Sequence, residues 1–65
     1  MDYEMELARV RGQYHRAQEK LYRAIEEKNP GAAQIWEANL ESLSKQLWDL
    51  ENLVKVQKAR ERRRN

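Results

Sequence analysis

The chain has 65 residues and no cysteine, and its 13 Lys and Arg against 11 Asp and Glu give a net charge of +2. A chain of this length forms one small domain whose core supplies only about 3–5 kcal/mol, and without cysteine neither a disulfide nor a thiolate metal site can add to it. No apolar run approaches the roughly 18 residues that cross a membrane. We therefore expect a cytoplasmic protein with no membrane association, which gains further burial from a second copy or a partner protein.

The first predicted element is a helix over about residues 2–28. Asp2 is suited to cap it, and Glu4 and Glu6 complement the positive end of the helix dipole. Gly12, which falls opposite the apolar seam, is its weak point. The apolar residues alternate in spacings of four and three, which is typical of a coiled-coil seam and not of a strand. They are Tyr3, Leu7, Val10, Tyr14, Ala17, Leu21 and Ala24.

A turn is predicted at residues 29–31, where the sequence reads Asn-Pro-Gly. Pro30 cannot lie inside a continuous helix, because it lacks the N–H group and clashes with the preceding turn. Asn29 as the N-cap, with Pro30 as the first residue of a second helix, satisfies both residues. So short a connection favours antiparallel helices.

The second helix is expected over about residues 30–60, with a matching apolar ladder. Folding the ladders about the turn places Leu7 near Val54 and Ala17 near Leu43. The predicted fold class is all-α: a coiled-coil-like antiparallel two-helix hairpin over residues 1–60. Its second ladder consists of Ala33, Trp36, Leu40, Leu43, Leu47, Leu50 and Val54.

The remaining residues, 61–65, are predicted to form a basic C-terminal tail. Residues 1–54 carry 7 Lys and Arg against 10 Asp and Glu, whereas residues 55–65 carry 6 against 1. Such an end favours anionic partners, although cations at a helix C-terminus also complement the dipole without any partner. Candidate contacts to nucleic acid or another anion are Arg60, Arg62, Arg63 and Arg64.

Several large apolar residues lie off the seam and cannot be used by a single hairpin. One alternative is that they fold around the edge of the seam. The other is that a second hairpin or a partner protein covers them, and Trp48 favours this, because tryptophan is enriched at interface hot spots. The sequence thus predicts a homodimer, built as a four-helix bundle. Its candidate interface residues are Trp48, Leu53, Tyr22, Ile25, Ile35 and Val56, and Met5 also points outward.

Arg9, Arg16 and Arg23 recur every seven residues on one outer face of the first helix. An arginine ladder beside flat rings is a surface that can grip phosphates and stack bases. The alternative is a solvated face whose arginines pair with Glu19, Glu26 and Glu27.

No catalytic, metal or cofactor site is expected. His15 is the only histidine, and with Glu19 it supplies too few ligands for a dedicated metal site. There is no Gly-rich phosphate loop either. The sequence therefore favours a non-enzymatic regulator or adaptor that binds and modulates another protein. The alternatives are a small nucleic-acid-binding regulator and a binder of a small anionic ligand such as a nucleotide, held between subunits.

In length and architecture the expected hairpin resembles two groups of proteins. Plasmid copy-number regulators dimerise into four-helix bundles and bind paired RNA loops. The co-chaperones of type III secretion are also short helical hairpins, and the stretch from Ile35-Trp36-Glu37 to Leu50 is similar to theirs in texture. Small regulators of phages and mobile elements often share this compact, charge-rich character. These likenesses concern architecture and imply no site residue.

Overall fold

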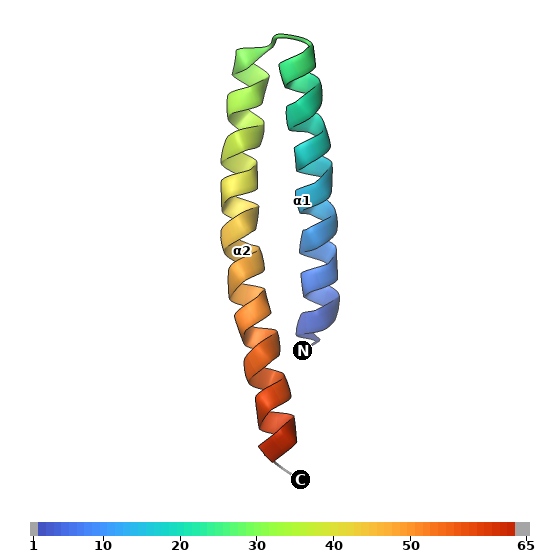
Figure 1. The fold of residues 1–65 in the computed structure, drawn as a ribbon, viewed down its shortest axis with the longest axis vertical. Helices are drawn as coiled ribbons and strands as arrows, with labels where there is room; N and C mark the ends of the chain where they lie inside the picture. Colours follow the sequence, from blue (N-terminus) through green and yellow to red (C-terminus); the bar gives the residue numbers. More distant parts are fainter. Residues whose placement is uncertain (1, 64–65) are drawn as a thin grey trace.

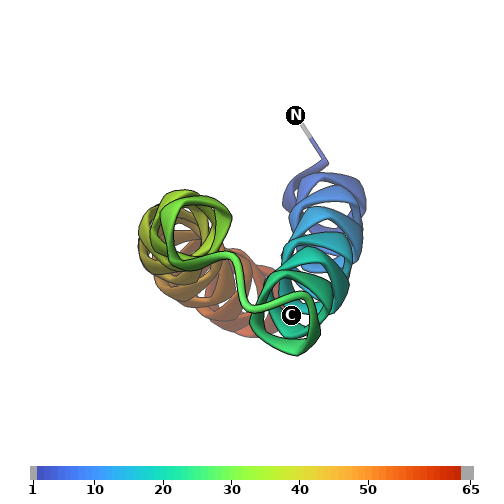
Figure 2. The ribbon, with the colours of Figure 1, turned by 90° about the horizontal axis from the view of Figure 1, so that it is seen from above.

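The computed structural model describes residues 2–63 as an antiparallel helical hairpin (Figure 1). Helix α1 spans Tyr3–Glu26 and helix α2 spans Pro30–Arg63, and these residues contain no strand. The predicted all-α hairpin is confirmed. The molecule is a rod whose Cα atoms extend over 55 × 15 × 14 Å. Seen along the rod, the two helices are inclined to one another and do not run strictly parallel (Figure 2).

Helix α1 begins at a side-chain cap, as the sequence predicts. The Asp2 carboxylate accepts hydrogen bonds from the backbone N–H groups of Glu4 at 3.0 Å and Met5 at 3.3 Å. Two donors that the first helical turn would leave without partners are thereby satisfied.

The end of α1 lies at Glu26, two residues earlier than the sequence suggests. Lys28 adopts a left-handed backbone conformation, with φ at 54°. Its N–H donates to the carbonyl oxygen of Ile25 at 3.0 Å, and the N–H of Asn29 donates to that of Ala24 at 2.9 Å. These two bonds form a Schellman motif, which closes the helix and reverses the chain.

Asn29 then caps α2. Its side-chain oxygen accepts from the N–H of Ala32 at 3.2 Å, and its carbonyl oxygen accepts from that of Ala33 at 3.1 Å. Pro30 is the first residue of the helix, as predicted, where its missing N–H group costs nothing.

Every residue of the two predicted ladders is buried or half-buried, but the core is thin. The fully buried apolar residues are Leu7, Val10, Ala17, Ala24 and Val54. Four of these five belong to α1. The leucines of the α2 ladder are only half-buried, so one hairpin leaves part of its own seam accessible.

Helix α2 is longer than α1 and continues beyond the N-terminal end of α1 (Figure 1). Lys58 Nζ lies 3.3 Å from Glu4 Oε1, which places the start of α1 beside residue 58. The part of α2 from residue 59 to Arg63 projects beyond α1. Arg60 and Arg62, expected at the end of the helix and in a tail outside it, therefore lie on α2 itself. Arg63 is its last residue, and Arg64 lies outside the described residues.

Candidate interaction surfaces

Large apolar side chains are exposed along both helices. Trp48 is 67% exposed and Leu53, the least exposed of the set, is 41% exposed. Each member of the set therefore keeps at least 41% of its surface accessible in the single hairpin. The set comprises Met5, Tyr22, Ile25, Ile35, Trp48, Leu53 and Val56, the same residues that the sequence places off the seam.

Three of these residues form a patch on the C-terminal half of α2. Trp48, Leu53 and Val56, here called the α2 apolar patch, line a shallow hollow of about 400 Å³ together with Asp49 and Asn52. Around the helix Val56 lies between the other two, about 80° from Trp48 and about 60° from Leu53, so the patch covers a broad sector of α2.

The other predicted interface residues lie at the turn end of the hairpin. Ile25 lines a hollow of about 360 Å³ with Lys28 and Pro30. Ile35 is in the second turn of α2, about 20 Å along the helix from Trp48. The predicted interface residues therefore lie in two regions, one at the turn end of the hairpin and one on the C-terminal half of α2.

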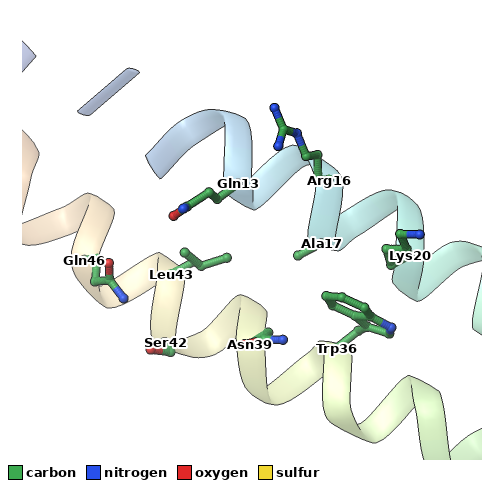
Figure 3. A pocket seen from close by; sticks show the side chains of 9 residues that line it. All are labelled: Gln13, Arg16, Ala17, Lys20, Trp36, Asn39, Ser42, Leu43 and Gln46. Atoms are coloured by element: carbon green, nitrogen blue, oxygen red, sulfur yellow. The ribbon is translucent and has the colours of Figure 1, made fainter. Parts of the chain in front are cut away.

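A groove runs between the two helices in the middle of the rod, with a volume of about 430 Å³ (Figure 3). Helix α1 lines it with Gln13, Arg16, Ala17 and Lys20. Helix α2 lines it with Trp36, Asn39, Ser42, Leu43 and Gln46. We call this feature the central groove.

The central groove has an apolar floor and one basic edge. Ala17, Leu43 and Trp36 lie between the helices, whereas the Arg16 guanidinium extends outward from the α1 edge (Figure 3). Ala17 is buried, so the accessible apolar surface of the groove comes mainly from Leu43 and Trp36, which are half-buried. No carboxylate lines the groove, and Arg16 and Lys20 are its only charged residues.

The arginine ladder is divided among different environments. Arg9 donates hydrogen bonds to the Glu6 carboxylate, one of them from Nε to Oε2 at 3.4 Å. These bonds lower the pKa of the Glu6 carboxyl and raise the pKa of Arg9. Arg16 lines the central groove, and Arg23 is exposed one heptad further on. The carboxylate beside Arg9 is Glu6, which the sequence analysis did not pair with it.

The other side of the hairpin carries charges of both signs. Arg11 Nη2 lies 3.5 Å from Glu51 Oε1, and the Glu4–Lys58 pair lies along the same side. All four residues line a hollow of about 490 Å³ with Leu7 and Val54 at its base. Arg11 and Gln13 differ by about 200° around α1, so this hollow and the central groove open on opposite sides of the seam. The hollow is lined by three cations, Lys55 included, and two carboxylates, whereas the central groove is lined by two cations and no carboxylate.

Three further observations concern metal sites, membrane-spanning helices and similarity to known proteins. Within residues 2–63 no three His, Cys, Asp or Glu side chains are placed to hold a metal ion. Neither described helix is long and apolar enough to cross a membrane. Comparison of the chain with protein-family models, with curated proteins and with solved structures yields no match. The candidate functional features of the chain are the two apolar regions, the central groove and the basic end of α2.

Proposed function

We propose that this chain is a non-enzymatic interaction protein that dimerises through the α2 apolar patch and binds another protein. The supporting observation is the imbalance between its core and its surface. Among the described residues, five apolar residues are buried, and two of them are alanines, while seven large apolar side chains remain exposed. A hairpin with so little buried surface is marginally stable alone, and covering exposed apolar surface contributes about 25 cal/mol per Å².

Trp48 is the residue on which this interface most depends. A tryptophan buries up to about 250 Å² when fully covered, and truncation of such an anchor at an interface commonly costs about 2 kcal/mol or more. In a symmetric dimer the same patch is used twice, so Trp48, Leu53 and Val56 of one copy pack on those of the other. A four-helix bundle also requires contacts from α1, for which Tyr22 and Ile25 are the exposed candidates. We place this activity in the cytoplasm, because a protein without cysteine has no disulfides and needs no oxidising compartment.

The test is the mass of two matched variants by light scattering. Trp48→Ala should shift the protein towards the monomer. Glu41→Ala changes the same heptad position one repeat earlier on α2, where no apolar patch exists, and should leave the mass unchanged. Equal masses for the two variants would exclude Trp48 from the interface.

A second candidate function is nucleic-acid binding by the projecting end of α2. The observation that favours it is that Arg60 and Arg62 lie on a helix with no part of α1 beside it. Cations fixed on a helix can contact phosphates of a duplex at regular intervals, and binding of this kind depends little on sequence.

This candidate is tested by titrating a DNA duplex and an RNA hairpin at several salt concentrations. Phosphate contacts should give an affinity that falls steeply with salt, and Arg60→Gln with Arg62→Gln should reduce that slope by about two. Arg23→Gln is a matched control on the other helix. If the double variant binds as tightly as the wild type, the end of α2 is not the nucleic-acid-binding site.

A further inference from the structure

We propose that the central groove is a docking site for an amphipathic helix of a partner protein, with carboxylates along one border of its apolar face. This rests on the proposed function of protein binding and adds where the partner binds and what its chemistry is. The site is separate from the α2 apolar patch, so partner binding and dimerisation use different residues.

The length of the groove fits a helix. Its lining extends from residue 36 to residue 46 along α2, which corresponds to about 15 Å or nearly three helical turns. Recognition of a helix in a groove requires an apolar floor that accepts side chains spaced three and four residues apart. Trp36, Leu43 and Ala17 supply such a floor (Figure 3).

The positive charge of the groove favours a docked helix with acidic residues along one border. Arg16 and Lys20 lie one helical turn apart on the α1 edge, and no lining residue is acidic. Glutamates at i and i+4 of a docked helix match this spacing. A carboxylate can accept two parallel hydrogen bonds from the guanidinium of Arg16, so that arginine sets the orientation as well as the charge. The α2 edge offers the neutral groups of Asn39, Ser42 and Gln46, which suit uncharged polar residues on the opposite border.

Other occupants fit less well. A nucleic acid would meet cations on one edge only and would leave the apolar floor without a complementary group. A second copy of this chain would have to present its own apolar surface. Its α2 apolar patch is flanked by Asp49 and Lys55 and therefore brings no excess of negative charge to Arg16 and Lys20.

The probe is a synthetic helical peptide of about four turns, with leucines spaced three and four residues apart and glutamates along one border. The control peptide has the same sequence with lysines in place of the glutamates. Binding is measured by fluorescence anisotropy. A protein carrying Trp48→Phe, in which Trp36 is the only tryptophan, reports whether the groove is occupied. We expect the glutamate peptide to bind, to shift the Trp36 emission, and to bind at least about tenfold more tightly than the lysine peptide.

Variants locate the site. Arg16→Glu combined with Lys20→Glu should weaken the glutamate peptide by about tenfold or more and strengthen the lysine peptide. Arg23→Glu, one heptad from Arg16 on the same face but outside the groove, should leave both affinities within about twofold. Helical content by circular dichroism checks that each variant is folded.

Several outcomes would overturn the inference. They include no binding of the glutamate peptide, equal binding of both peptides, an unchanged Trp36 emission, or binding that ignores the two charge reversals. Displacement of the peptide by duplex RNA that itself depends on Arg16 and Lys20 would assign the groove to nucleic acid. Loss of the dimer on the charge reversals would assign it to a second copy. Trp48→Ala separates the two proposals, because it should abolish the dimer and leave peptide binding intact.

Discussion

Arg11 of α1 and Glu51 of α2 form an ion pair across the hairpin, with 3.5 Å between Nη2 and Oε1. The second cross-helix pair, Glu4 with Lys58, lies one heptad earlier on α1 and one heptad later on α2. Two pairs displaced in opposite directions by the same repeat are what an antiparallel register requires. A slip of α2 by four residues that put Lys55 opposite Arg11 would break this pair and bring two like charges together.

The first prediction concerns this register. Arg11→Glu should destabilise the hairpin because it places a second carboxylate beside Glu51. Adding Glu51→Arg should restore most of the loss. Since the two side chains are 57% and 45% exposed, the coupling should be only about 0.2–1 kcal/mol at low salt. Urea unfolding of the four proteins of the double-mutant cycle measures it. The coupling should fade at high salt, and a coupling that salt leaves unchanged would contradict a solvent-exposed pair.

A second prediction follows from the left-handed conformation of Lys28. A residue with a side chain pays about 1–2 kcal/mol in that region, and glycine does not. Glycine also makes the unfolded chain more flexible, which offsets part of the gain. Lys28→Gly should therefore raise the free energy of unfolding by about 0.5–1 kcal/mol. Lys45→Gly, in the middle of α2, should lower it by about 1 kcal/mol. Thermal unfolding at a fixed protein concentration compares the two, and destabilisation by Lys28→Gly would argue against the Schellman turn.

Gly12 gives a third prediction. A Cβ atom at this position would meet no atom within 4 Å, and the backbone there is helical. Gly12→Ala should therefore stabilise α1 by up to about 1 kcal/mol, as alanine does at open helical positions. The dimer mass should not change. If Gly12→Ala weakens the dimer, another chain approaches the backbone at residue 12 and the interface includes α1.

The fourth prediction is a dependence on pH. The hydrogen bonds from Arg9 lower the pKa of the Glu6 carboxyl in the folded protein. A carboxyl with a lowered folded-state pKa contributes stability that is present above its unfolded pKa and is lost as the pH falls through the folded value. NMR titration of Glu6 should give a lower pKa in the wild type than in Arg9→Gln. Identical titration curves would show that the pair does not persist in solution.

Much of the fold is predictable from the sequence because its signals are local or periodic. The two ladders, the Asp2 cap and the Asn29-Pro30 start of α2 follow from spacing and from backbone chemistry within a few residues. The end of α1 was harder to predict from the sequence. The left-handed position that ends the helix carries Lys28, whereas such a position is usually recognised from a glycine. The end of α2 was placed too early because a seam that ends at Val54 does not require the helix to end there.

The candidate surfaces were predictable only in part. Exposure of Trp48 and its companions follows from their positions off the ladders. The central groove could not be predicted from these positions, because it depends on the distance between two inclined helices, which the sequence pattern does not give. Trp36 was assigned to the seam, yet its ring also lines that groove (Figure 3). Glu51 has Lys55 one turn away in sequence, and only the folded register brings Arg11 to it.

The most direct test of the proposed function is the mass of the wild-type protein by sedimentation equilibrium over a wide concentration range. We expect a mass of twice the 7.9 kDa of one chain, with dissociation to the monomer on dilution. Emission from Trp48, followed in a protein carrying Trp36→Phe, should shift to that of a solvated indole over the same range. A mass of 7.9 kDa at every concentration, with Trp48 solvated throughout, would contradict dimerisation through the α2 apolar patch.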